Sequence, residues 1–381
     1  MIQASLTAPA IHSVLHTESS LGWGGQENRT LNEMSALSTL GWRCLLACRP
    51  GARLGERAAE QGFAVHEIDM RGFADLASMA ALRRLIHTEA VDVVNSHSGR
   101  DSQLAGLAVR SLFAQRPAMV RTRHLALPVR SRFGYSVLPD HVVTVSDHVR
   151  RYLVSVGVSD QAITPVLTGV DLQVYQTPSQ QAWRSDGGTL RSELGLPPDT
   201  PLIGTVAILR VKKGHADLLE AVPQVLSRYP NAHFVFAGDG PQQKNLRAKI
   251  SDMQLSERVL MLGLRSDVGN ILHSLDIFVL PTHQEALGTA FVEAGAMCLP
   301  SIGTHVDGVP EVILDGQTGL LVPPHESGAL AEAIIKLLAD PALRHRLGKA
   351  ARQRVQTHFS LQAMGHNMIS VYEKLLSRLG K

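Results

Sequence analysis

The sequence has few aromatic residues and few cysteines, and each shortage excludes a class of protein. Phe, Trp and Tyr make up 4% of the 381 residues, so the hydrophobic cores must be built from aliphatic side chains. The three cysteines, Cys44, Cys48 and Cys298, form neither a zinc-binding pattern nor a disulfide framework. We therefore expect a reducing compartment, with the cytoplasm as the default.

Long apolar runs and a basic N-terminal leader are also lacking. No stretch approaches the length that crosses a bilayer, and residues 1–10 carry no basic group ahead of an apolar core, which argues against a secretory signal. The composition is that of a globular protein, with 44% hydrophobic and 19% charged residues. A chain of this length fits two domains better than one.

Positive charge is concentrated in one segment, although the net charge of the chain is only +3. Between residues 110 and 151 eight arginines are opposed by Asp140 and Asp147, a local balance of 8 − 2 = +6. A solvated basic face explains this as well as attraction to an anionic acceptor or peripheral contact with an anionic membrane does. Nucleic acid is a weaker explanation, because no aromatic residues for base stacking alternate with the arginines.

Apolar runs and helix-like segments alternate along both halves of the chain. The alternation begins with a strand at 11–17, lapses over 177–200, which is rich in Pro, Ser, Gln and Gly, and restarts at 202–209. Strands that alternate with helices indicate a parallel sheet covered on both faces. We predict an α/β fold with two doubly wound domains and a cleft between them. The predicted divisions are an N-terminal domain at 1–177, a linker at 178–200, a C-terminal domain at 201–360 and a C-terminal helix at 361–381.

Two glutamates flank the start of a predicted helix. Glu285 lies in the loop after the strand at 276–280, and Glu293 lies about one turn into the helix at 289–297. Both carboxylates can face one pocket, because helical side chains lean toward the helix N-terminus. The amides of residues 286–289 favour anions and sugar oxygens. Alone, such a pair is more often a solvated loop glutamate and a glutamate that the helix dipole stabilises.

A cationic loop follows another predicted strand, at 202–209. Arg210 and Lys213 in this loop can both meet a diphosphate, the first as a planar fork and the second as a point charge. A reaction that expels a diphosphate needs its growing negative charge neutralised. An ordinary basic loop explains these two residues equally well.

The sequence around these residues resembles that of the retaining glycosyltransferases of family four, the group 1 glycosyl transferases, which have the two-Rossmann-domain GT-B fold. Glu285 and Glu293 fit the E-x7-E motif of that family. The resemblance covers about the whole chain and is most specific in the C-terminal half. Its other motifs are Gly24-Gly25-Gln26-Glu27-Asn28, Ala237-Gly238-Asp239-Gly240-Pro241, Leu262-Gly263-Leu264-Arg265, Cys298-Leu299-Pro300, His305 to Glu311 and Asp315 to Pro323.

The resemblance implies that the C-terminal domain binds a nucleotide sugar. Glu285 would contact hydroxyls of the donor sugar, and Glu293 would bind the ribose of the nucleotide. Lys213 and Arg210 would meet the diphosphate. The other donor-binding residues that it implies are Gly263, Leu264 and Arg265 beside the base, and Ala286, Leu287, Gly288 and Thr289 at the helix start.

The resemblance also implies roles in the N-terminal, acceptor-binding domain. His124 ends the strand at 118–123 and would face the donor sugar near its reacting carbon, while His97 would lie on the acceptor side. A strand-end histidine bonded to the backbone is the alternative for each, and it is stronger for His97. Gly25 allows close approach to a phosphate or sugar. Trp23 would line the acceptor cleft, although a packing role explains it equally well.

Several positions depart from the family pattern. The arginine usual five residues before the lysine is replaced by Ile208, and Arg210 stands two residues later. Ala286 and Asp307 each replace a frequent glycine, and Met297 and Cys298 stand where Cys-Gly is usual. These departures leave the identity of the sugar open.

We therefore expect an enzyme that moves a sugar from a nucleotide diphosphate, with retention of configuration, to a glycan or lipid-linked acceptor in cell-surface polysaccharide or lipopolysaccharide biosynthesis. The resemblance favours a UDP-sugar, no cofactor, no metal and a C-terminal helix that crosses back to the N-terminal domain. Two alternatives stay open. One is a nucleotide-sugar epimerase, a phosphorylase or another GT-B enzyme, and the other is a non-catalytic protein that binds sugar nucleotides.

Overall fold

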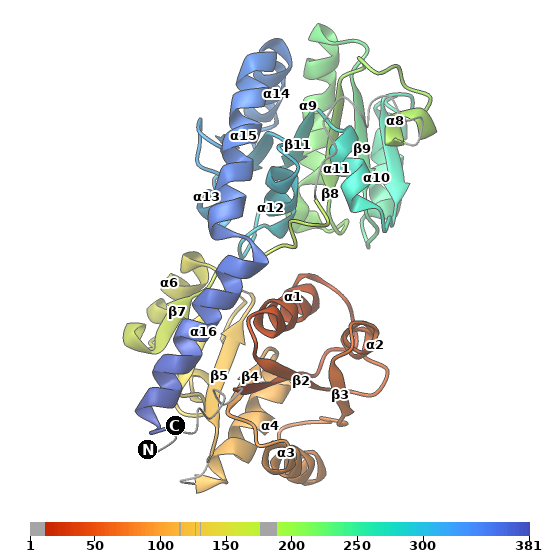
Figure 1. The fold of residues 1–381 in the computed structure, drawn as a ribbon. Helices are drawn as coiled ribbons and strands as arrows, with labels where there is room; N and C mark the ends of the chain where they lie inside the picture. The colour runs from red at the N-terminus through yellow and green to blue at the C-terminus, as the bar shows by residue number, and fades with distance from the viewer. Residues whose placement is uncertain (1–11, 114–115, 126, 130, 176–188) are drawn as a thin grey trace, which may run out of the picture. The chain divides into compact units, whose positions relative to one another are not determined.

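The computed structural model describes residues 12–113, 116–125, 127–129, 131–175 and 189–381 (Figure 1). The chain forms two compact units. Unit 1 runs to Gly169 and also includes Leu361–Lys381, and unit 2 is Val170–Ser360. Residues 1–10, which were predicted not to be a secretory signal, lie outside the described residues. Residues 178–188 of the predicted linker lie outside them as well. In the described part, no helix is both long and apolar enough to cross a membrane.

The remainder of the predicted linker is packed into unit 2. The guanidinium of Arg191 is buried and donates hydrogen bonds to Ser274 O and Asp276 Oδ2, both at 2.8 Å. A buried guanidinium needs such partners to offset its lost hydration. Residues 189–200 therefore belong to the second unit, and the division between the units falls at 169 rather than at the predicted 177.

Unit 1 contains a parallel sheet of seven described strands in the order β3-β2-β1-β4-β5-β6-β7. β1 and β4 are buried along their whole length, as expected for strands covered on both faces. The strands are β1 (Ser13–Glu18), β2 (Arg43–Cys48), β3 (Ala64–Glu67), β4 (Val93–Ser96), β5 (Ala118–Arg123), β6 (His141–Thr144) and β7 (Ile163–Pro165). The helices are α1 (Gly25–Thr39), α2 (Arg53–Glu60), α3 (Leu76–Thr88), α4 (Gly99–Arg110), α5 (Phe133–Ser136), α6 (Asp147–Ser155), the 3-10 turn η2 (Asp160–Ala162) and α16 (Leu361–Arg378).

Two hydrophobic cores lie on opposite faces of this sheet. Val14 and Leu15 are neighbours on β1, and because side chains alternate along a strand they enter different cores. The core that holds Val14 also contains residues of α1, α2 and α16, and the core that holds Leu15 contains residues of α3 and α4. The sheet is therefore sandwiched between two helical layers.

The C-terminal helix α16 packs against α1 in unit 1 (Figure 1). Tyr372 of α16 is fully buried, and its ring lies 5.4 Å from the Trp42 ring, between centroids. The return of the chain to its N-terminal part confirms the predicted crossing of 361–381.

Unit 2 contains a parallel sheet of six described strands in the order β10-β9-β8-β11-β12-β13. The strands are β8 (Leu202–Val206), β9 (His233–Ala237), β10 (Val259–Gly263), β11 (Ile277–Leu280), β12 (Ser301–Thr304) and β13 (Gly319–Val322). The helices are α8 (Leu190–Glu193), the 3-10 turn η3 (Val211–Lys213), α9 (His215–Arg228), α10 (Gln243–Asp252), α11 (Val268–Ser274), α12 (Thr289–Ala296), α13 (Val309–Val312), α14 (Ser327–Ala339) and α15 (Pro341–His358).

Both sheets share the doubly wound strand order 3-2-1-4-5-6, counted within each unit. In this order the first strand lies beside the fourth, and the chain turns outward in opposite directions from that point. Ligands of doubly wound folds bind at the carboxyl ends of these two strands. Ligand sites are therefore expected in the loops that follow β1 and β4 in unit 1, and β8 and β11 in unit 2.

Candidate functional site

The cationic loop and the glutamate loop of unit 2 meet at the carboxyl ends of β8 and β11. The ammonium group of Lys213, at the end of η3, forms an ion pair with the carboxylate of Glu285. Two hydrogen bonds join the same loops, since the amide of His283 and the hydroxyl of Thr282 donate to Lys212 O at 2.7 and 2.9 Å. Lys213 and Glu285, which are 72 residues apart, are thus fixed side by side.

Glycines allow these loops to approach so closely. Gly214 has φ of +70°, and a Cβ there would lie 1.8 Å from the carbonyl oxygen of Pro281. Gly288, which caps α12, has φ of +97°. L-residues with a side chain rarely adopt such angles, so both positions require glycine.

Asp307 stands where glycine is frequent in the family, and its side chain bonds to the loop that carries Glu285. Its φ is +49°, a backbone conformation that glycine adopts most easily. Its Oδ2 accepts a hydrogen bond from the amide of Glu285 at 3.0 Å, and the amide of Gly308 donates to Glu285 O at 3.1 Å. Both hydrogen bonds of this segment fix the backbone of Glu285.

Glu293 lies on α12 and is half-buried. Its carboxyl group is hydrogen-bonded to the hydroxyl of Tyr175, and burial nevertheless raises the pKa of Glu293 to about 7. The same bond and burial raise the pKa of Tyr175, so the phenol keeps its proton and donates it. Near neutral pH this carboxylate is therefore close to its midpoint of ionisation.

The remaining predicted donor residues are placed differently. Leu264 is 81% exposed beside Gly263, which has φ of +69°. Arg265 is held by two carboxylates, Glu193 on α8 at 2.6 Å and Asp267 at 2.7 Å, so its guanidinium stabilises the local fold. Arg210 is exposed. Ala286, Leu287 and Thr289 lie in or beside the turn that starts α12, with Leu287 buried.

Three buried histidines form a hydrogen-bonded chain in unit 1. His16 lies on β1, His97 directly follows β4 and His124 directly follows β5. His16 Nδ1 is 2.9 Å from His97 Nε2, and His97 Nδ1 is 3.0 Å from His124 Nε2. Burial lowers the pKa of His16 to about 4 and holds the pKa values of His97 and His124 well below their usual range. All three rings are neutral at physiological pH.

The hydrogen-bond partners of His97 could not be predicted from the sequence. Both of its ring nitrogens are bonded to other histidines, so neither faces an acceptor in this structure. His16 was missed as a candidate. The signal that could have found it is the strand order, because β1, β4 and β5 are consecutive neighbours and bring positions 81 and 27 residues apart together.

The glycine turn before α1 is held by a buried carboxyl group. Glu18 accepts hydrogen bonds from the amide of Ser20 at 2.8 Å and from Gln26 Nε2 at 2.6 Å. Burial and the nearby charge of Asp101 raise the pKa of Glu18 to about 8. A Cβ at Gly25 would meet no atom within 4 Å, so open space borders the turn.

Trp23 packs beneath a cation at the same turn. The guanidinium of Arg57 on α2 lies 4.0 Å from the centre of the Trp23 ring. This geometry is that of a cation–π contact. It supports the packing alternative for Trp23.

One group of described residues could hold a metal ion. The ligand atoms of Asp217, His283 and His325 all lie within 4.8 Å of one another, and two imidazoles with a carboxylate suit a zinc-like cation. His283 Nε2 and Asp217 Oδ2 are 2.7 Å apart. This pair also ties the first turn of α9 to the loop that carries Glu285.

Four of the eight arginines of the basic segment 110–151 form ion pairs with acidic neighbours. Asp140 pairs with Arg110 and Arg116, and Asp147 pairs with Arg150 and Arg151. Arg121 is buried with its guanidinium 3.7 Å from the Tyr135 ring centre. Arg123 donates to Leu127 O, Arg132 is exposed, and Arg130 lies outside the described residues.

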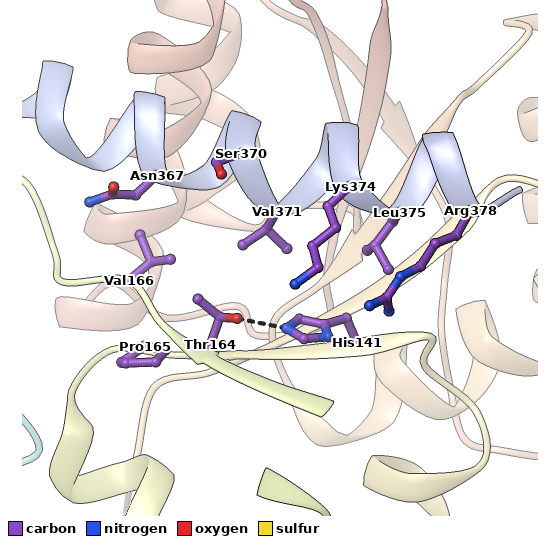
Figure 2. Close-up of a pocket in the computed structure, with 10 residues that line it drawn as sticks. All are labelled: His141, Thr164, Pro165, Val166, Asn367, Ser370, Val371, Lys374, Leu375 and Arg378. Atoms are coloured by element: carbon purple, nitrogen blue, oxygen red, sulfur yellow. Dashed lines mark hydrogen bonds between the residues drawn. The ribbon is translucent and has the colours of Figure 1, made fainter. Parts of the chain in front are cut away.

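A cavity of about 290 Å³ lies between α16 and the strands β6 and β7 of unit 1 (Figure 2). Figure 2 shows Lys374 and Arg378 reaching from the helix toward His141, which bonds to Thr164 Oγ1 at 2.8 Å. None of the predicted site residues lines this cavity. It is separate from the histidine chain and from the glycine turn.

Two doubly wound parallel sheets, each with polar residues at its switch point, define the GT-B class of fold. Residues 188–354 match the family model of glycosyl transferases group 1, and residues 23–174 match that of glycosyltransferase family 4. The chain belongs to this family. It is a retaining glycosyltransferase that uses a nucleotide-sugar donor.

Relatives of known sequence agree with this assignment, and a solved structure shares the fold. A GDP-mannose-dependent phosphatidylinositol monomannoside mannosyltransferase of Corynebacterium glutamicum is 30% identical over 262 residues, which are 63% of this chain and 67% of that protein. The lipopolysaccharide core biosynthesis glycosyltransferase LpsE of Rhizobium meliloti is 30% identical over 46% of this chain and 50% of its own. Anabaena HepE, solved with UDP-glucose, superposes with a TM-score of 0.81 at 20% identity over 95% of this chain and 99% of that one.

Proposed function

We propose that this enzyme transfers a sugar from a UDP-sugar to a glycan or lipid-linked acceptor in cell-surface polysaccharide or lipopolysaccharide biosynthesis. The observation that carries the proposal is the ion pair between Lys213 and Glu285 at the switch point of unit 2, with Glu293 on the helix that follows. A cation paired with one carboxylate, and a second carboxylate on the following helix, match a ligand that has a diphosphate and two sets of sugar hydroxyls.

Each of the three groups meets a different part of that donor. Lys213 neutralises the diphosphate, whose charge grows as the glycosidic bond breaks. Glu285 accepts hydrogen bonds from the transferred sugar, and Glu293 accepts them from the ribose. Arg210 is exposed and can turn its guanidinium to the diphosphate.

The proposed reaction does not depend on a metal ion, because the cationic side chains supply the charge that a metal would supply. Turnover is therefore expected to persist after treatment with EDTA. A loss of turnover that Mg²⁺ or Mn²⁺ restores would overturn this part of the proposal.

The choice of base and acceptor rests on the relatives. HepE was solved with UDP-glucose, and LpsE is a lipopolysaccharide core glycosyltransferase, which supports uridine as the base and a surface glycan as the acceptor. The name of the Corynebacterium mannosyltransferase includes GDP-mannose, so GDP-sugars belong in any test.

A thermal-shift screen of nucleoside diphosphates and their sugars tests the donor. Binding of a nucleotide to the folded state raises the melting temperature, by an amount that grows with ligand concentration over Kd. We expect UDP and a UDP-sugar to give the largest shift and Glu293→Ala to reduce it. Equal affinity for the nucleotide in Glu293→Ala would refute the ribose assignment.

Lys213→Ala tests the role of Lys213 in catalysis, in an assay of donor turnover with an acceptor present. We expect turnover to fall at least tenfold, because the leaving diphosphate loses a positive charge. An unaltered rate would remove Lys213 from the mechanism. Conversion of the donor to another sugar isomer without any acceptor would indicate an epimerase instead of a transferase.

A further inference from the structure

In the three-histidine chain of unit 1, four of the six ring nitrogens form hydrogen bonds between the histidines. The inner two contacts join His16 to His97 and His97 to His124, at 2.9 and 3.0 Å. The ends of the chain are His16 Nε2 and His124 Nδ1. His16 Nε2 is buried, and neither it nor His124 Nδ1 has a hydrogen bond to any described residue.

Each contact in this chain joins one N–H to one bare nitrogen, because all three rings are neutral. A neutral imidazole carries a single proton, so the direction of one hydrogen bond fixes the direction of the other. Two arrangements exist. In one, the protons lie on the three Nδ1 atoms, and in the other they lie on the three Nε2 atoms.

The buried end of the chain selects between these arrangements. Protons on Nε2 would leave an N–H of His16 buried without an acceptor, which native proteins avoid more strictly than an unpaired acceptor. Protons on Nδ1 leave only a bare nitrogen at that place. His16 then donates to His97, His97 donates to His124, and His124 keeps its own proton on Nδ1.

We propose that His16 and His97 are positioning residues that hold His124 as its neutral Nδ1–H tautomer, so that His124 presents a hydrogen-bond donor to an oxygen of a ligand at the carboxyl end of the unit 1 sheet. The identity of that ligand rests on the proposed function, but the tautomer does not. His124 follows β5, directly beside the switch-point strand β4, which suits such a contact.

The proposal excludes a role for His124 as a general base in this state. Its Nε2 accepts the hydrogen bond of His97, and its Nδ1 already carries a proton. The ring therefore recognises an acceptor oxygen by direct donation. A substrate that lacks the contacted oxygen is expected to lose turnover.

Two-bond ¹H–¹⁵N correlation spectra of the ¹⁵N-histidine-labelled full chain test the tautomer directly. The His124 signals are assigned with His124→Gln. We expect a protonated Nδ1 and a bare Nε2 for both His97 and His124 in the wild type. A proton on Nε2 of His124 would overturn the proposal, whatever the enzyme transfers.

His97→Gln tests the positioning role. We expect the His124 signals to shift toward a mixture of tautomers, and kcat to fall at least tenfold with little change in KM for the donor. The nucleotide-binding residues lie in unit 2, so the thermal shift with UDP should persist and serves as the check on folding. His141→Gln is the matched control, because His141 is also a buried histidine of unit 1 but lies outside the chain.

His97→Gln with wild-type His124 signals and wild-type kcat would refute the role of the chain. If no nucleotide sugar is turned over while His124 still carries its proton on Nδ1, the proposed function fails and the tautomer assignment stands. Failures of the two proposals are thus distinguishable.

Discussion

At the scale of single residues, the most informative groups are two carboxyl groups whose pKa values are raised by burial. Glu293 has a pKa of about 7 and Glu18 one of about 8, each raised mainly by loss of hydration. The first lies among the predicted donor residues, and the second holds the glycine turn. Their ionisation makes two properties of the enzyme depend on pH near neutrality.

Donor affinity is expected to rise with pH. An ionised Glu293 accepts hydrogen bonds from ribose hydroxyls better than the protonated acid does, and with a pKa of about 7 its ionised fraction grows about tenfold between pH 6 and 8. We expect the Kd for UDP-glucose, whose own phosphates stay ionised over this range, to fall about tenfold in calorimetry. Glu293→Gln should bind more weakly with a flat profile, and a flat wild-type profile would contradict the assignment.

Stability is expected to fall as the pH rises toward about 8 because of Glu18. Its pKa is raised on folding, so its contribution is fully present below the unfolded value of about 4.5 and is lost as the pH rises through about 8. Above pH 8 an ionised Glu18 lies in the same buried region as Asp101. Glu18→Gln should therefore gain melting temperature relative to the wild type between pH 6 and 9, by about 2–4 °C for each kcal/mol. Glu56→Gln, an exposed change on α2, should show no such trend in the same thermal scans.

At the scale of elements, α16 stabilises α1 through a polar contact inside an apolar interface. The hydroxyl of Tyr372 donates to Glu33 Oε1 and accepts from Asn95 Nδ2, both at 3.0 Å. Glu33 also receives the guanidinium of Arg29 at 2.6 Å. Asn95 of β4 also donates to Glu33 Oε1 at 2.8 Å, so residues from three elements satisfy the buried carboxylate.

Tyr372→Phe should lower the free energy of unfolding of unit 1 by about 1.5–3 kcal/mol, the usual range for a hydrogen bond to a charged group. Urea unfolding monitored by fluorescence measures this change. Tyr152→Phe is a milder comparison, because the Tyr152 hydroxyl accepts from the amide of Val129 at a half-buried place. A loss no larger than that of Tyr152→Phe would show that the bond to Glu33 contributes little.

The elements themselves were largely predictable, and the contacts between them were not. Alternating apolar runs predicted the strand at 276–280 and the helix after it, which the structure has as β11 and α12. The short strand β7 and the helix α2 carry too little periodicity to have been named. The position of Lys213 beside Glu285, and of His16 beside His97, depends on strand order, which local sequence does not encode.

At the scale of the whole molecule, the sequence predicted the fold class and two doubly wound domains but misplaced their division. Residues 189–200 lack periodicity, which suggested a linker, yet Arg191 anchors them to unit 2 through Asp276. Amino-acid composition does not predict a single buried ion pair such as this one. The predicted site assignments stay predictions until the donor experiments are done.

Unit 1 is discontinuous in sequence, which leads to a prediction about truncation. Removal of 361–381 exposes the apolar face of α1, because Met364, Met368 and Tyr372 are all nearly fully buried. We expect limited proteolysis to degrade the N-terminal portion of the truncated chain rapidly while a fragment near 189–360 survives. The thermal shift with UDP should also survive. Equal resistance of both portions would contradict a structural role for α16.

The bond between Tyr175 and Glu293 has a consequence for the ribose contact proposed for Glu293. The phenol already donates to this half-buried carboxyl group, so the group has a partner before any nucleotide binds. A carboxylate has two oxygens, so a ribose hydroxyl would either take a remaining acceptor position or displace the phenol. In either case the ribose meets an acceptor that the folded chain already partners, rather than a free one.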